Sequence, residues 1–432
     1  MTATTTSPAT PSQDDGADRP PVSLWRGRVG LIVGIVLLGI TLRYAITGMS
    51  PLLTTLRTEM GIGVAGASFL GMLPTLSFGT AGFLAPVLIR RWSPELTAAL
   101  AMLLAAAGTA GRAMTHNVPL FFVLSAVALF GMGFGNVVGA PLVKKYFPDR
   151  QASMLTVFAL LMQAGASLPA MTAVPIADAA GWRISIASWS ILSLLAALPW
   201  IVQLVKAGKK KSAASVAPGS SAGATGLNLG VGQLIKSPIA VGTALFYAMA
   251  SLNTYGMLAW MPTIFQSGGM NQAAAAAAFS VFTFLTLPMA LITPILATKL
   301  KNVTPIAIVL ALVFPVGYIG MITAPNLALL WAFIMGIGGG AFPLAITMFN
   351  KRTRTAQGSA AIAGFAMGIG YLFGTLGPLL GGALFSATGS WTAALIVFAF
   401  TSILAVIGGA LMTRGTKSLE DKFTPNDAKE EN

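Results

Sequence analysis

Charged side chains in this chain are confined to short gaps between long apolar segments. Charged residues make up 9% of the 432 residues and hydrophobic residues 55%, whereas a soluble protein carries about a quarter charged residues. A helix that crosses a bilayer needs about 20 apolar residues. The sequence therefore predicts an all-α integral membrane protein that crosses the bilayer many times.

Twelve segments reach the necessary length, six in each half of the chain. They are expected at about 29–56, 64–89, 96–114, 118–143, 152–177, 183–205, 238–265, 272–298, 304–323, 326–348, 357–387 and 392–413. Residues 206–237 carry a lysine cluster and then a stretch rich in Ser, Gly, Ala and Pro, which is typical of a flexible linker. We expect six-helix bundles over 29–205 and 238–413. Residues 1–28 are rich in Thr, Ser, Pro and Asp and are expected to be disordered, and 414–432 form a tail.

The basic residues lie mainly in alternate gaps between these segments. Of the 26 Lys and Arg residues, 22 fall on the side that carries the linker, and the other four are Arg43, Arg57, Arg112 and Arg183. This asymmetry follows the positive-inside rule, and it predicts that both termini and the linker face the cytoplasm. The net charge of +14 is thereby assigned to membrane topology and not to nucleic-acid binding.

Several kinds of chemistry are excluded by composition. The chain has no cysteine and a single histidine, His116, which is expected in a short outer loop. Disulfides, thiolate metal sites and cysteine nucleophiles are therefore ruled out, and no metal or cofactor is expected. No nucleophile–base pair is visible in the sequence, so an enzyme is not predicted.

One charge breaks the pattern, because Arg43 lies near the middle of the first apolar segment. No carboxylate lies inside any such segment, and Glu59 follows only 16 residues later, roughly 24 Å away along a helix. Three roles are open to Arg43: contact with a substrate, snorkelling to the outer interface, or a structural role with its donors satisfied by backbone and amide groups. Intramembrane charges are functional by default, and the planar guanidinium suits an oxyanion, so the substrate role is favoured.

Glycines repeat between the two halves. The fourth and tenth expected helices carry them at a common offset of 205 residues, namely Gly131, Gly133 and Gly135, then Gly336, Gly338 and Gly340. No strand precedes them, so they are not nucleotide loops, and glycine inside apolar helices allows close packing. Two six-helix halves around a long basic loop suggest the major facilitator architecture, with a substrate site between the halves.

Short motifs along the chain carry a closer resemblance. They are Leu42-Arg43, Pro51-Leu52-Leu53, Gly135-Asn136, Phe147-Pro148-Asp149-Arg150, Gly181-Trp182-Arg183, Trp260-Met261-Pro262, Gly370-Tyr371-Leu372 and Gly377-Pro378. In their order and spacing, from about residue 30 to 413, the chain resembles the cyanate-porter and nitroimidazole-transporter (CynX/NimT-like) branch of the major facilitator superfamily. The resemblance implies a monomeric twelve-helix transporter of the bacterial cytoplasmic (inner) membrane. Its substrate would be a small anion or polar heteroaromatic compound, moved by alternating access.

The chain departs from the superfamily pattern in the loop after the second helix. Gly82 and the pair Arg90 and Arg91 are kept and are expected to serve in gating. Pro86 stands where the pattern has an aspartate, and Ile89 where it has a glycine. The charge interaction that this aspartate supports in other members is therefore in doubt here.

A second departure lies beside the intramembrane arginine. The branch commonly has Asn-Leu-Arg-Pro, where this chain has Thr41-Leu42-Arg43-Tyr44. Loss of the proline is expected to remove a helix kink or rigid turn at this point. Family membership is accordingly better supported than cyanate as the substrate.

The predicted substrate site gathers polar side chains around Arg43: Tyr44, Asn136, Gln163, Asn253, Tyr255 and Tyr371. Asn136, Gln163, Asn253, Tyr255 and Tyr371 each have an alternative role as a hydrogen bond between packed helices. The seventh helix, equivalent to the first, has no arginine, so one cation suits a monovalent anion or a neutral dipolar ligand. Trp260 is expected in the interfacial aromatic belt, and Arg112 as an interfacial anchor.

Two rival functions remain open. One is a multidrug or hydrophobic-compound efflux antiporter, which the missing intramembrane acid disfavours for cationic drugs. The other is a transporter-derived sensor that binds ligand without net flux, and it is disfavoured because no signalling domain is appended. No intramembrane Asp, Glu or His is present to carry a coupling proton. Transport is therefore either coupled through the substrate's own protonation or through exchange for a counter-anion, or it is facilitated diffusion.

Overall fold

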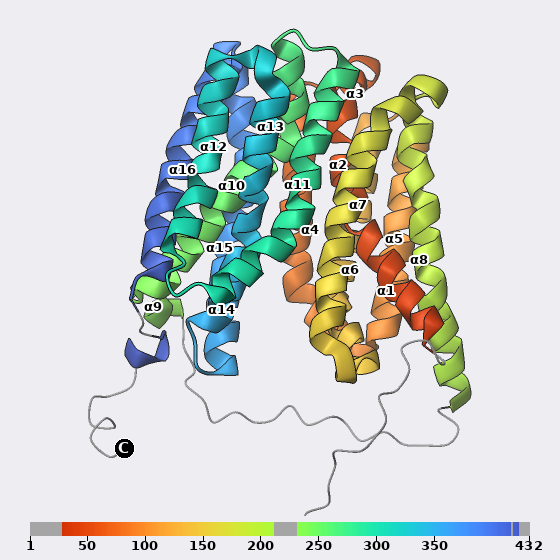
Figure 1. Ribbon diagram of the computed structural model, residues 1–432. Coiled ribbons are helices and arrows are strands. Elements are labelled where there is room, and N and C mark those ends of the chain that lie inside the picture. The colour runs from red at the N-terminus through yellow and green to blue at the C-terminus, as the bar shows by residue number, and fades with distance from the viewer. Residues whose placement is uncertain (1–27, 211–230, 416–417, 423–432) are drawn as a thin grey trace, which may run out of the picture.

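The computed structural model describes residues 28–210, 231–415 and 418–422. The predicted disordered N-terminus up to residue 27, most of the predicted linker and most of the predicted tail lie outside the described residues. In the described chain the secondary structure is entirely helical. The helices stand side by side in two groups, red to yellow and green to blue in Figure 1.

The first group contains six membrane spans. The first span is assembled from α1 (Val29–Thr41), α2 (Tyr44–Thr47), η1 (Ser50–Leu52) and α3 (Leu53–Met60). The other five are α4 (Val64–Arg91), α5 (Pro94–Met114), α6 (Val118–Tyr146), α7 (Gln151–Ala180), which follows η2 (Pro148–Arg150), and α8 (Trp182–Lys210).

The second group begins with α9 (Val231–Leu234) and also has six long elements. They are α10 (Pro238–Ser267), α11 (Gln272–Lys299), α12 (Thr304–Thr323), the composite of η3 (Pro325–Leu327), α13 (Ala328–Ile337), η4 (Gly338–Gly340) and α14 (Ala341–Lys351), then α15 (Ala356–Thr388) and α16 (Trp391–Thr413). A last short element, η5 (Glu420–Lys422), follows. The expected tenth helix is therefore divided at its three consecutive glycines, where a tighter 3₁₀ turn replaces the α-helix.

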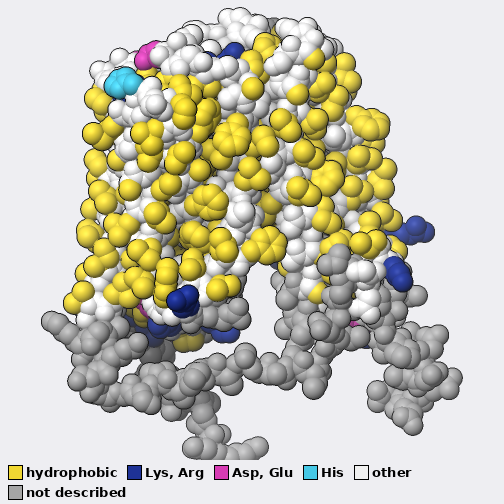
Figure 2. Space-filling view, turned by 180° about the vertical axis from the view of Figure 1, so that it is seen from behind, with side chains coloured by type: hydrophobic (Ala, Val, Ile, Leu, Met, Phe, Trp, Pro, Cys, Tyr) yellow, Lys and Arg dark blue, Asp and Glu magenta, His cyan; other side chains and the backbone are white. Residues whose placement is uncertain are grey.

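Membrane-spanning length and composition are met by eleven of the described spans. The twelfth is α10, which has 30 residues and runs the height of the molecule in Figure 1. Its polar side chains, among them Asn253 and Thr254, lower its mean hydropathy. Figure 2 shows the apolar side chains spread over the flank of the molecule, as a surface in contact with lipid requires.

Local sequence signals set where many helices begin and end. Ser93, Asn117 and Asn271 precede α5, α6 and α11, and each side chain accepts a hydrogen bond from a backbone amide in the first turn. Gly61 and Gly389 end α3 and α15 in the left-handed conformation, with φ of 67° and 69°. These caps explain why the predicted boundaries lie close to the observed ones.

The two bundles meet along α4 and α15, which run antiparallel. Ser68 packs on Gly382, and the hydroxyls of Thr75 and Thr375 share a hydrogen bond of 2.9 Å. One turn further, a Cβ on Gly79 would lie 3.6 Å from the Cβ of Tyr371. The seam is thus closely packed from the α3 end of the molecule to its middle.

Beyond Gly79 the seam opens. The next residues in the same register are Gly82 and Gly368, and a Cβ added to either would lie more than 4 Å from every described atom of another helix. Figure 2 shows a wedge between the bundles at this end, which is also where α8 ends and α9 begins (Figure 1). The two bundles are therefore closed against each other at the end that carries α3 and open at the opposite end, where α8 terminates.

Part of the predicted tail is docked on the second bundle. The Glu420 carboxylate accepts hydrogen bonds of 3.0–3.1 Å from the amides of Arg354 and Thr355 and from the Thr355 hydroxyl. Arg354 also forms a 2.9 Å ion pair with Asp421. Since Thr355 is the N-cap of α15, the Glu420 carboxylate supports the start of this helix, where backbone amides otherwise lack partners.

We expect this contact to weaken in acid. Burial alone would raise the pKa of Glu420, but the hydrogen bonds from backbone amides and from Thr355 outweigh it and lower the pKa below its ordinary value. A lowered folded-state pKa stabilises the fold above the unfolded-state pKa, and the benefit is lost as pH falls through the folded-state pKa. Glu420→Gln should therefore destabilise the protein by about 1–3 kcal/mol near neutral pH and by little at low pH.

Thermal unfolding of the purified protein and the variant, followed from about pH 7 down to about pH 3, measures the effect. Asp178→Asn, which changes an exposed carboxyl, is the matched control and should leave the melting temperature unchanged. A wild type and Glu420→Gln variant that differ equally at every pH would contradict the prediction.

Candidate functional site

The first span is interrupted at Leu42 and Arg43. α1 ends at Thr41, Arg43 has φ −132° and ψ −5°, and α2 begins at Tyr44. The expectation that loss of the proline would remove a turn here is wrong, because the turn is present without it. A helix that breaks inside a membrane protein places backbone groups and side chains around a cavity.

Contacts with neighbouring helices stabilise the interruption between α1 and α2. Gly165 of α7 has no side chain, which lets its backbone lie directly against the carbonyl of Ile40. On the other side of the break, the Tyr44 hydroxyl shares hydrogen bonds of 2.9 Å with Thr109 and Ser193. Contacts with neighbouring helices therefore stabilise the turn that a proline after the arginine is expected to produce in other members of the branch.

Arg43 remains without a protein anion at this break. Its side chain is half-buried, its Nε is buried without a hydrogen-bond partner, and among the described residues it forms no ion pair. Tyr255 of the other bundle lines the same cavity as Arg43. In the described chain, a cation without an anionic partner thus lies beside Tyr255 where the two bundles meet.

A small cavity of about 30 Å³ adjoins this cation. It is lined by Arg43, Ile46 and Thr47 of the first span, Ala166 of α7, Thr254, Tyr255 and Leu258 of α10, and Phe282, Thr283 and Thr286 of α11. A cavity of this size exceeds the roughly 10–15 Å³ that one water needs. Because both bundles line it, a bound molecule would touch both at once.

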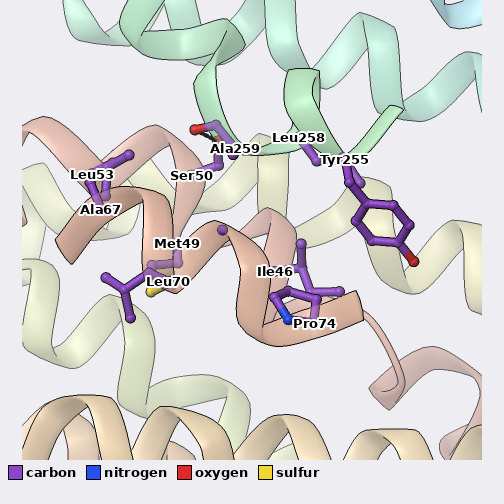
Figure 3. A pocket seen from close by; sticks show the side chains of 11 residues that line it. Ile46, Met49, Ser50, Leu53, Ala67, Leu70, Pro74, Tyr255, Leu258 and Ala259 are labelled. Atoms are coloured by element: carbon purple, nitrogen blue, oxygen red, sulfur yellow. Dashed lines mark hydrogen bonds between the residues drawn. The ribbon is translucent and has the colours of Figure 1, made fainter. Parts of the chain in front are cut away.

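An apolar pocket of about 20 Å³ lies on the α3 side of this cavity. Figure 3 shows its lining, in which Ile46, Met49 and Leu53 face Leu70 and Leu258. Tyr255 borders both spaces, and its hydroxyl points away from the apolar one (Figure 3). The apolar side chains close the path from Arg43 toward the α3 end.

Hydrogen bonds between the bundles complete the closure. The Thr54 hydroxyl donates to the side-chain oxygen of Gln266 at 2.7 Å. The Gln272 amide donates to the carbonyl of Pro51 at 3.0 Å and to the Thr55 hydroxyl at 3.1 Å. These three contacts, which we call the outer seal, join the first span to α10 and α11.

The predicted site residues divide into two groups. Arg43 and Tyr255 line the cavity, whereas Tyr371 is half-buried on α15, with its Cβ beside Gly79. Asn136 and Gln163 are half-buried and are not among the residues that line the cavity. Gln163 lies one helical turn before the lining residue Ala166.

Tyr44 and Asn253 are engaged inside their own bundles. Tyr44 bonds α5 and α8 as described above. Asn253 donates to the Met249 carbonyl at 2.8 Å and accepts from the Tyr318 hydroxyl, also at 2.8 Å. Both side chains therefore hold helices together, which is the alternative role expected for Asn253 and was not predicted for Tyr44.

Two interfacial assignments are wrong. Trp260 is 0% exposed and its indole donates to the Pro378 carbonyl at 2.9 Å. Arg112 is 1% exposed, and its guanidinium reaches the sulfur of Met49 at 3.7 Å. Both side chains lie on helix faces that other helices cover. Apolar composition does not reveal which face of α10 or α5 is covered.

Four threonines of the cavity were not predicted. Thr254 stands between two predicted residues, and Thr283 and Thr286 are three residues apart, which places them on one helix face. That spacing on α11 was the one available signal. Of the predicted gating residues, Gly82 faces the wedge and Arg91 is exposed, while only the backbone of Arg90 is described.

Comparison with known proteins places this architecture in a family. The Major Facilitator Superfamily profile matches residues 35–374. Over 88% of its length the chain is 32% identical to 92% of an uncharacterized transporter of Bacillus subtilis. Over 89% it is 31% identical to 95% of the 2-nitroimidazole transporter of Escherichia coli and 25% identical to 96% of the cyanate transport protein of the same species.

A solved structure agrees on the fold. A nucleoside transporter superimposes with a TM-score of 0.69, at 12% identity, and covers 89% of this chain and 100% of its own. The protein is therefore a membrane transporter and not an enzyme. It belongs to the major facilitator superfamily, and the predicted resemblance to its cyanate and nitroimidazole branch is confirmed.

The outer seal predicts a conformation-specific cross-link. The natural chain has no cysteine, so Thr54→Cys with Gln266→Cys introduces the sole thiol pair. A short thiol cross-linker should join them and stop transport, because the bundles then remain closed at the α3 end, and reduction of a cleavable linker should restore it. Transport assays of the cross-linked and reduced protein in liposomes provide the measurement.

The matched control is the single variant Thr54→Cys treated with the same reagent, which should retain transport. Full transport by the cross-linked double variant would show that the seal does not have to open.

Proposed function

We propose that this transporter carries a small anion or a polar heteroaromatic compound, cyanate-like or nitroimidazole-like, by alternating access. The observation that carries the proposal is the uncompensated Arg43 at a helix break, beside a cavity lined by both bundles. A buried cation without a partner is costly. A substrate with an acceptor group offsets that cost each time it binds.

The chemistry of arginine supports an anionic or strongly dipolar ligand. A guanidinium carries five N–H donors and no acceptor, and its planar shape matches a carboxylate-like or nitro group. The cavity is small, which suits a compact solute. Two relatives that match over 89% of this chain are described as transporters of 2-nitroimidazole and of cyanate, and both compounds have polar acceptor atoms of this kind.

The asymmetry of the bundles supports the transport cycle. With the basic side assigned to the cytoplasm, the open end of the wedge faces the cytoplasm and the outer seal faces outside. In this arrangement the protein lies in the inner membrane of a bacterium with both termini inside. The reverse conformation would close the wedge, bringing Gly82 toward Gly368, with Arg90 and Arg91 at the gate.

The efflux of cationic drugs is less well supported. Recognition of a cation calls for an acidic side chain at the site, whereas the residues that line the cavity include a cation and no acid. Tyr255 and the four threonines that line the cavity with Arg43 instead offer hydroxyls, which suit polar neutral and anionic solutes.

Arg43→Ala should fold and insert but lose transport. Removing one partner of a buried charge interaction costs about 2–5 kcal/mol, so affinity should fall by at least about 30-fold. Arg43→Lys should also be impaired, because an ammonium cannot reproduce the planar fork. Uptake of labelled cyanate and 2-nitroimidazole into liposomes measures both variants.

Arg150→Ala is the matched control, since it removes a cation from a loop outside the cavity and should transport like the wild type. Normal uptake by a well-inserted Arg43→Ala protein would refute the assignment of Arg43 to the substrate.

A further inference from the structure

Four threonine hydroxyls line the cavity beside Arg43, together with Tyr255, and the four threonines are not equivalent. Thr47 donates to the carbonyl of Arg43 at 3.3 Å, Thr283 to that of Ser280 at 3.0 Å, and Thr286 to that of Thr283 at 2.6 Å. Each of these three protons is therefore bound within its own helix, which leaves only oxygen lone pairs for a ligand.

Thr254 is the exception. Its hydroxyl is buried, the residue is 7% exposed, and among the residues that the structure describes it has no hydrogen-bond partner. A buried hydroxyl without a partner is unfavourable. Since Thr254 lines the same cavity as Arg43, its free proton is available to a molecule bound there.

We infer that the Thr254 hydroxyl is a specificity-determining hydrogen-bond donor for the substrate, opposite Arg43. The inference rests on the proposed function, and it narrows the substrate class. Arg43 donates from the first bundle and Thr254 from the second, so the favoured solute presents unprotonated acceptor atoms to both. Cyanate, nitrite and the nitro group with its neighbouring ring nitrogen have such atoms, whereas protonated amines do not.

The arrangement also assigns Thr254 a part in coupling the bundles. A ligand bonded to Arg43 alone is held by one bundle, whereas a ligand bonded to both residues bridges them. Binding energy realised only when both bundles surround the substrate favours the closed, loaded state over the open one. Loss of the Thr254 donor should therefore weaken binding without weakening the fold.

The chain supplies a matched control on the same helix. Thr263 is also on α10, is also 7% exposed and also has a buried hydroxyl without a partner in the described chain, but it is not among the residues that line the cavity. Thr254→Val and Thr263→Val therefore make the same chemical change at equal burial. Thr254→Ser keeps the donor and tests for rescue.

The experiment measures binding of sodium cyanate, sodium nitrite and 2-nitroimidazole to purified wild type and variants by ligand-dependent thermal stabilisation. We expect Thr254→Val to bind about 10–100-fold more weakly, the range for a hydrogen bond to a charged group. Thr254→Ser and Thr263→Val should stay within about threefold of the wild type, a change smaller than one typical hydrogen bond contributes. Melting temperatures without ligand should be equal for the two valine variants.

Arg43→Ala distinguishes a failure of the inference about Thr254 from a failure of the proposed function. If it abolishes binding while Thr254→Val binds like Thr263→Val, the inference about Thr254 is overturned and the proposed function stands. If Arg43→Ala binds every probe like the wild type, or no probe binds the wild type, the proposed function fails and the inference with it.

Discussion

An arginine that pairs with no anion in the described part of the chain, at a break in the first membrane span, is the constraint on which the centre of this structure depends. In lipid every backbone polar group needs an internal partner, so a break is stable only where other helices enclose it. Gly165 supplies the close approach of α7, and Tyr44 bonds the far side of the break to α5 and α8. The enclosed space beside Arg43 is the cavity that both bundles share.

Small residues determine how the bundles meet around that cavity. Along α4 and α15 the contacts fall in one antiparallel register, from Ser68 on Gly382 to Gly79 beside Tyr371, and they stop before Gly82 and Gly368. Because glycine and threonine have few rotamers to rearrange, such a seam can open or close by rigid movement of one bundle against the other. The outer seal of Thr54, Gln266 and Gln272 keeps the bundles together at the α3 end, opposite the wedge.

Sequence reasoning succeeded where a property belongs to one segment. The spans and the isolated charge of Arg43 are both visible in the order of residues, because hydropathy is a property of one segment of about 20 residues. It failed at Trp260 and Arg112, which lie in apolar helices and contact Pro378 and Met49 from distant parts of the chain. A polar group in an apolar helix indicates that a partner is needed, but not which helix provides it.

The sequence by itself determined that this chain crosses a membrane with its basic loops on one side and carries one cation in its first span. Hydropathy and charge are sums over neighbouring residues, so they need no knowledge of the fold. Only the tertiary structure decided that the Thr254 hydroxyl has no hydrogen-bond partner among the described residues while the Thr283 hydroxyl has one. It also decided that the wedge begins at Gly82. Hydrogen-bond satisfaction and empty space depend on atoms brought together from helices far apart in the chain.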